Sequence, residues 1–174
     1  DQIDAYSIDK SSASALRPLS VLQPTTHDEC VSIMQAANRH QMPVVIRGAG
    51  SGTTGGAVPT DQSVVVSLEK MNQIIDMDCK NGVVVVEPGC IVHDIQVEVE
   101  SNGLFYPLDP ASLSYCTIGG NIAENAGGPR AIKYGTTRDY VIGLKGVWAN
   151  GEPFKLGGKQ IKNVVGYDLI RLLV

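Results

Sequence analysis

The sequence is poor in aromatic residues, has no long apolar run and carries no excess of positive charge. Aromatic residues make up 5% of the 174 positions, and Lys plus Arg number 14 against 18 Asp plus Glu. The net charge of −4 excludes an electrostatic footprint for nucleic acid, because phosphate backbones select basic surfaces. No apolar stretch approaches the roughly 18 residues of a membrane-spanning helix.

Cysteine is scarce and widely spaced. The four cysteines are Cys30, Cys79, Cys90 and Cys116. They form no Cys-x-x-Cys pair, which argues against a zinc site and against a dense disulfide framework. We therefore expect free thiols and a cytoplasmic protein. The opening residues, Asp1 to Asp4, include no basic segment, so the sequence predicts no signal peptide or one already removed.

A hydrophobic content of 43% against 18% charged residues excludes disorder and predicts a real core. Helical and strand-like segments mix without a regular alternation, which indicates an α+β fold. Thr26 and Glu29 form an expected capping box before the first helix. The expected strands are 19–22, 43–47 (buried), 64–66, 74–76, 83–86, 140–149 and 152–156, and the expected helices are 27–40, 92–102 and 167–174. Turns are expected at Asn81-Gly82 and Asn150-Gly151, and Asn102-Gly103 should stop the second helix.

Glycine, unlike the residues above, is abundant. Nineteen glycines are present, and five of them fall within the nine residues from Gly48 to Gly56, directly after an expected strand. Consecutive small residues let backbone amides converge on phosphate oxygens, and Arg47 at the mouth of this loop adds positive charge. A dinucleotide fingerprint is excluded because Pro59 and the next strand leave no room for its helix. A flexible surface loop is the alternative.

A second stretch, residues 107–128, is also dominated by small side chains. Thr117 is placed to cap a helix within it, and a helix start with exposed amides binds anions or carbonyl oxygens. Small side chains also let a flat ring lie against the backbone. Tight packing between helices is the alternative explanation.

The two stretches together resemble a known family. Residues 43–52 (PVVIRGAGSG) and 116–128 (CTIGGNIAENAGG) are similar to the PCMH-type FAD-binding domain of the vanillyl-alcohol oxidase superfamily. The branch they resemble most contains glycolate oxidase flavoprotein subunits, D-lactate dehydrogenases and D-2-hydroxyglutarate dehydrogenases. Shorter motifs at 86–89, 133–135 and 165–169 fit the same branch. The resemblance covers roughly residues 18–174 and implies a first α/β lobe (18–72) and a second lobe (73–174) that is incomplete at its C-terminus. Residues 1–17, before it, are polar and small and are expected to form an N-terminal arm or extended lead-in.

The resemblance also implies non-covalent FAD and the residues that hold it. The first loop would wrap the pyrophosphate, the second stretch would line the ribityl chain and isoalloxazine, and a later strand would reach the adenine. Ser51 stands where covalent members carry a histidine, so no tether is expected. Local turn capping and strand packing are the alternatives for the less specific positions. The implied FAD-binding residues are Arg47, Gly48, Ala49, Gly50, Ser51, Gly52, Thr53, Pro110, Ser112, Thr117, Gly119, Gly120, Ala123, Asn125, Ala126 and Ile142.

The implied activity is oxidation of a D-2-hydroxy acid to a 2-oxo acid, with hydride passing to flavin N5. The electron acceptor stays open, as does association with an iron–sulfur subunit or the inner membrane. In the family a cap domain carries the metal ligands and the base, and no such cluster or catalytic residue is found here. We therefore expect a fragment that is inactive alone. A non-catalytic FAD-binding module and a reductase of the enolpyruvyl-UDP-sugar type are the alternatives.

Overall fold

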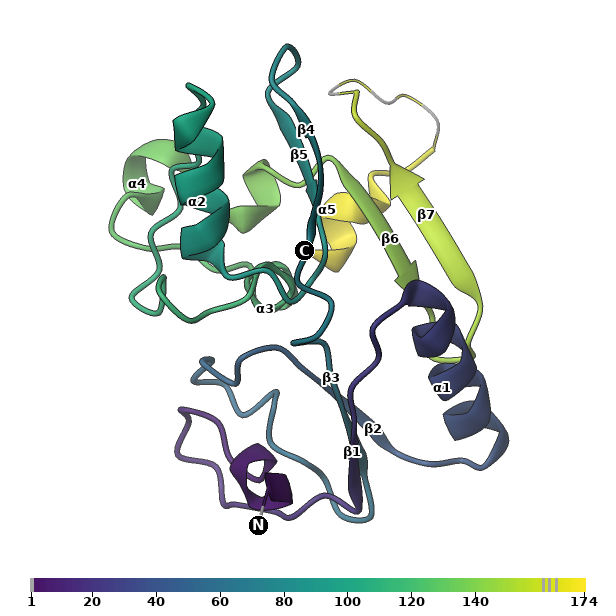
Figure 1. Ribbon diagram of the computed structural model, residues 1–174. Helices are drawn as coiled ribbons and strands as arrows, with labels where there is room; N and C mark the ends of the chain where they lie inside the picture. The colour runs from purple at the N-terminus through teal and green to yellow at the C-terminus, as the bar shows by residue number, and fades with distance from the viewer. Residues whose placement is uncertain (1, 161, 163, 165) are drawn as a thin grey trace.

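The computed structural model describes residues 2–160, 162, 164 and 166–174. Asp1 of the expected arm and Val165 of the 165–169 motif lie outside the described residues. The predicted α+β class is confirmed (Figure 1). The strands are β1 (Ser20–Leu22), β2 (Val44–Arg47), β3 (Val64–Ser67), β4 (Ile74–Asp78), β5 (Val83–Val86), β6 (Gly143–Val147) and β7 (Pro153–Gly157). The helices are η1 (Gln2–Tyr6), α1 (His27–Arg39), α2 (Val92–Ser101), α3 (Ile118–Ala123), α4 (Ala131–Tyr134), η2 (Thr137–Asp139) and α5 (Leu169–Leu173).

A parallel sheet of order β1-β3-β2 carries the first glycine-rich loop at the end of β2. β3 is central, and its Val65 and Val66 are almost completely buried. β2 is an edge strand, so the prediction that it is buried is wrong: Ile46 is 49% exposed, and of the four β2 residues only Arg47 is buried. The apolar run correctly predicted a strand. Which strand of the sheet is central and buried depends on the order in which the strands pair, and the run itself does not show that order.

α1 begins as its sequence predicts. The Thr26 side chain accepts a hydrogen bond from the Glu29 amide at 3.2 Å. The reciprocal bond differs from the expected capping box, because the Glu29 carboxylate accepts from the Thr25 amide at 2.6 Å. α1 also lies beside β6 (Figure 1), and Gly151 in the β6–β7 turn sits directly against Gln35. The C-terminal hairpin is therefore fixed on the helix of the first sheet.

Apart from the buried residues of β3, a second core of hydrophobic residues forms between the β4–β5 hairpin and α2. The hairpin turns at Gly82, which has the positive φ of 63° that its Asn-Gly signal predicts. α2 ends at Ser101, and the predicted stop signal follows it as the cap residue Asn102 and the positive-φ Gly103. The buried residues of this core are Cys90, Val92, Ile95, Val99, Cys116 and Ile118. Because its members flank the start of α3, this core sets the position of the second small-residue stretch.

The N-terminal arm is more structured than its polar sequence suggests. It opens with η1, and the Leu16 amide donates back to the Ser7 carbonyl at 3.1 Å, so the segment folds on itself. The short α4 and η2 were not predicted either, and α5 is shorter than the expected 167–174 helix. Within the part of the chain that the structure describes, no helix is both long and apolar enough to span a membrane.

Candidate functional site

The two glycine-rich stretches meet in the folded chain. A Cβ atom added to Gly48 would lie 2.3 Å from the Thr117 hydroxyl oxygen. On the other side of the loop, the Thr54 hydroxyl donates to the Glu124 carboxylate at 2.7 Å. The fold therefore brings the first loop against the start of α3, and a side chain at position 48 would clash with Thr117.

The backbone amides of the first loop are free to donate hydrogen bonds to a ligand. Among the described residues, no acceptor is found for any backbone amide from Gly48 to Gly56. Gly50 has φ +64°, in the left-handed region that favours glycine. Gly52, in contrast, has neither a positive φ nor a close neighbour. Free amides in a glycine-rich turn form a concave donor set that suits the oxygens of a pyrophosphate.

Arg47 does not sit at the mouth of this loop, as the sequence suggested. Its side chain is buried beneath the loop, where Nη1 donates to the carbonyls of Ile8 at 2.9 Å and Ala57 at 3.2 Å. Burial lowers the pKa of Arg47, and the charge of Asp9 opposes that shift. An arginine stays protonated at neutral pH in either case. The guanidinium therefore gives the loop both a positive charge and a mechanical anchor.

The first amides of α3 are not free, which corrects the expectation of an anion site at this helix start. The Ile118 amide donates to the Cys90 carbonyl at 2.9 Å, and the Gly119 amide donates to the Pro88 carbonyl at 2.8 Å. The Gly120 amide donates to the Thr117 hydroxyl at 3.3 Å. The turn after β5 accepts from the first two amides, a long-range pairing that leaves no local signal, and the cap residue Thr117 accepts from the third.

Gly119 and Gly120 face different neighbours. A Cβ on Gly119 would lie 2.8 Å from both Cβ and O of Pro88, so its missing side chain is explained by packing. A Cβ on Gly120 would lie 3.2 Å from the Thr117 hydroxyl, on the side of the first loop. Ala123, at the last turn of α3, is exposed. Contact of these residues with a flavin stays a prediction.

Four further predicted positions, Pro110, Ser112, Asn125 and Ala126, lie in the segments on either side of α3. Pro110 and Ser112 belong to the irregular segment before it, where their carbonyls accept local turn bonds. Asn125 has φ +46°, and its side-chain oxygen accepts from the Arg138 amide at 3.0 Å. The Ala126 carbonyl accepts from the Thr137 hydroxyl at 2.7 Å. Asn125 and Ala126 thus join the end of α3 to η2.

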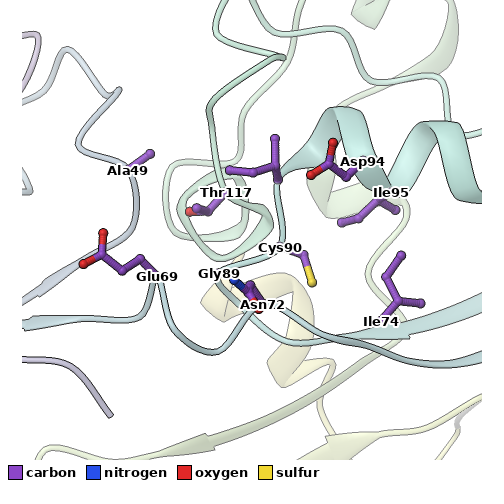
Figure 2. A pocket seen from close by; sticks show the side chains of 10 residues that line it. Ala49, Glu69, Asn72, Ile74, Gly89, Cys90, Asp94, Ile95 and Thr117 are labelled. Carbon is purple, nitrogen blue, oxygen red and sulfur yellow. The ribbon is translucent and has the colours of Figure 1, made fainter. Parts of the chain in front are cut away.

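A cavity of about 390 Å³ opens between the first loop and the second core (Figure 2). Ala49 and Thr117 are the predicted site residues on its wall. Sequence reasoning missed the rest of the lining as site residues, although the 86–89 motif pointed to the Gly89 turn that forms one edge. The lining residues are Ala49, Glu69, Asn72, Ile74, Gly89, Cys90, Ile91, Asp94, Ile95 and Thr117. The wall combines apolar side chains with a few polar groups, as cofactor pockets do.

Ile142 lies elsewhere, beside a second cavity of about 320 Å³. Its carbonyl accepts from the Gly158 amide at 3.1 Å, and a Cβ on Gly157 would lie 2.2 Å from that carbonyl oxygen. The structure therefore does not bring Ile142 into the first cavity.

Comparison with known proteins identifies the class of domain that this fold and loop define. The sequence profile of the FAD binding domain family matches residues 18–157. The chain belongs to this family, and its cofactor is FAD. The free amides of the first loop, the left-handed Gly50 and the buried guanidinium fit the diphosphate of that cofactor.

Three relatives are similar to nearly the whole length of this chain. Glycolate oxidase subunit GlcD of Bacillus subtilis (strain 168) is 47% identical over 169 residues, which are 97% of this chain and 36% of the relative. D-lactate dehydrogenase of Archaeoglobus fulgidus is 40% identical over 98% of this chain and 39% of its own length. D-2-hydroxyglutarate dehydrogenase of Stutzerimonas stutzeri is 37% identical over 100% of this chain and 38% of its own. The chain thus spans well under half the length of these relatives.

Solved structures share the fold at lower identity. An alkyldihydroxyacetonephosphate synthase superposes with a TM-score of 0.76 at 21% identity, covering 88% of this chain and 28% of that protein. The 6-hydroxy-D-nicotine oxidase of Arthrobacter nicotinovorans gives 0.75 at 21% identity, covering 90% and 34%. These likenesses show that the chain shares the fold of these two enzymes.

Proposed function

We propose that the complete protein oxidises a D-2-hydroxy acid, of the glycolate or D-lactate type, to a 2-oxo acid with FAD as the hydride acceptor. The observation that carries this proposal is similarity along nearly the whole chain to three relatives named for such acids. The flavin supplies the redox chemistry when bound. The residues of this chain bind the cofactor, orient it and exclude water from its phosphates.

The proposed arrangement places FAD between two lobes, 18–72 and 73–174. The amides of Gly48 to Thr53 hold the pyrophosphate; this assignment is supported because no acceptor for them is found in the described part of the chain. The α3 segment and its flanking turns line the flavin, and Ile142 receives the adenine. Attachment is non-covalent, because Ser51 stands at the position where a histidine would form a tether.

The substrate site lies, in this proposal, on the part of the protein beyond this chain. Among the described residues, no group of three or more His, Cys, Asp or Glu side chains is placed to hold a metal ion. Association of the complete protein with an iron–sulfur subunit or the inner-membrane surface is part of the same proposal. Co-purification from membranes and iron analysis of the complex test it.

The decisive experiment uses the complete gene product. We expect it to purify yellow, to release FAD on heat denaturation, and to reduce a dye with D-lactate, glycolate or D-2-hydroxyglutarate. The L-enantiomers of the chiral acids are the matched control. Bound FAD without turnover would favour a non-catalytic module, and NADPH consumption with an enolpyruvyl sugar nucleotide would favour the reductase. Flavin that stays with the precipitated protein would contradict non-covalent attachment.

A further inference from the structure

The N-terminal arm, which lies outside the matched residues 18–157, holds the first glycine-rich loop directly. The Lys10 amide donates to the Gly52 carbonyl at 3.2 Å. A Cβ on Gly55 would touch Ala13 and Ser11 of the arm at 3.5 and 3.6 Å. The arm therefore packs along the loop whose amides are proposed to hold the pyrophosphate.

Arg47 connects the arm, the loop and the end of β2. Its Nη1 bonds to Ile8 in the arm and to Ala57 just after the loop, so one guanidinium closes the loop at its base. A Cβ on Gly50 would lie 2.2 Å from Nη2, which shows how closely the loop backbone rests on this group. The side chain is 8% exposed, and charge-assisted bonds to carbonyls are strong in such surroundings.

Tyr6 fixes the arm beneath Arg47. The Arg47 Cζ atom lies 5.5 Å from the centre of the Tyr6 ring, within the range of a cation–π interaction. The Tyr6 hydroxyl donates to the Glu69 carboxylate at 2.6 Å and accepts from Gln23 at 2.9 Å. Glu69 also lines the cavity beside the loop. A continuous chain of contacts thus runs from the arm to the proposed cofactor site.

We propose that the arm segment 6–10 and Arg47 form a strap that holds the first loop in its cofactor-binding conformation. This inference rests on the proposed placement of the FAD pyrophosphate at that loop. Tyr6, Lys10 and Arg47 are positioning residues. The Lys10 amide bonds to the loop carbonyl of Gly52, Arg47 bonds to the Ala57 carbonyl just after the loop, and Tyr6 acts through its contact with Arg47. A loop held in place before binding loses less conformational freedom when the cofactor arrives.

The first test separates the geometry of the strap from its charge. Arg47→Lys keeps the positive charge but removes the planar guanidinium, whose Nη1 donates to both carbonyls and which lies over the Tyr6 ring. We expect FAD to bind roughly tenfold more weakly to Arg47→Lys, and at least as weakly after deletion of residues 2–10, since buried charge-assisted bonds are lost. Arg39→Lys, at an exposed position near the end of α1, is the matched control and should leave the affinity unchanged. Fluorescence quenching of FAD on the complete gene product gives the affinities.

The second test needs no variant. Trypsin cleavage at Lys10–Ser11 requires the arm to leave the loop, and linkage demands that a ligand favouring the held loop also favours the held arm. We expect saturating FAD to slow this cleavage about tenfold. Cleavage at Lys80–Asn81, in the exposed β4–β5 turn, should not change and serves as the control.

The outcomes distinguish a failure of the proposed strap from a failure of the proposed function. FAD binding with equal affinity in all variants, and equal cleavage at Lys10 with and without FAD, would overturn the strap and leave the proposed function standing. Failure of the unaltered complete protein to bind FAD would overturn both. If Arg47→Lys does not fold, the cleavage experiment on the unaltered protein decides alone.

Discussion

At the scale of single residues, Gly50 is the position on which the phosphate cradle depends most. A valine there would combine a positive φ of 64° with a Cβ atom 2.2 Å from the Arg47 guanidinium. Backbone strain of this kind costs about 1–3 kcal/mol, and the displaced loop would lose its convergent amides. We expect Gly50→Val to weaken FAD binding roughly tenfold to a hundredfold, measured by fluorescence quenching.

Gly82→Val is the matched control for Gly50→Val. Gly82 has a similar φ of 63°, but nothing lies within 4 Å of the position that a Cβ would occupy. The hairpin variant should therefore lose stability and keep its FAD affinity. Equal affinity for the Gly50→Val and unaltered proteins would show that the first loop is not the pyrophosphate cradle.

The cysteines differ in reactivity in a way that the sequence alone does not show. All four are free thiols, as predicted; Cys79 is exposed, whereas Cys90 and Cys116 are buried. Burial raises the pKa of the Cys90 and Cys116 thiols, which keeps the reactive thiolate scarce near neutral pH. We expect a chromogenic disulfide reagent at pH 7.5 to label Cys79 rapidly, and Cys90 and Cys116 only after unfolding. Rapid labelling of all four in the native protein would contradict the burial.

At the scale of elements, Gly119 tests how α3 is held against the turn after β5. An alanine normally stabilises a helix interior by about 1 kcal/mol relative to glycine. Here the new methyl group would lie 2.8 Å from Pro88, and overpacking of this kind costs about 1–3 kcal/mol. We expect Gly119→Ala to lower the thermal midpoint, by about 2–4 °C per kcal/mol of net loss.

Gly127→Ala is the matched control for this helix contact. Its Cβ would lie 3.4 Å from the Ala131 side chain, which is an ordinary van der Waals contact. The control should leave the thermal midpoint nearly unchanged. A midpoint for Gly119→Ala at or above that of the unaltered protein would show that the backbone yields at Pro88.

The elements that sequence reasoning located are those whose signals are local. The Asn81-Gly82 and Asn150-Gly151 turns and the Thr117 cap depend on a few neighbouring residues, and each appears where it was expected. The errors concern contacts between distant segments. The edge position of β2 depends on strand order, and the donors at the start of α3 are taken by residues near Pro88. Neither the strand order nor these hydrogen bonds can be predicted from a short segment of sequence.

At the scale of the whole molecule, the candidate site is assembled from segments that motif spacing alone cannot place. The two glycine-rich stretches were identified from the sequence, and the fold brings Gly48 against Thr117. The arm was read as a polar lead-in, yet Ile8 and Lys10 hold the loop. Polar segments give no periodic signal of burial, so their partners appear only in three dimensions.

Residues 1–174 alone should bind FAD without oxidising hydroxy acids. The three histidines lie on or beside α1 and α2, and His40 and His93 are exposed. Hydride removal from a hydroxy acid requires deprotonation of the hydroxyl, and a positioned base contributes about 10²–10⁴-fold. The measurement compares dye reduction by the isolated chain, reconstituted with FAD, with that of the complete gene product on D-lactate, glycolate and D-2-hydroxyglutarate. We expect less than about 1% of the complete protein's rate. Comparable rates would place the base and the substrate site within these residues and would refute the assignment of that chemistry to the remainder of the protein.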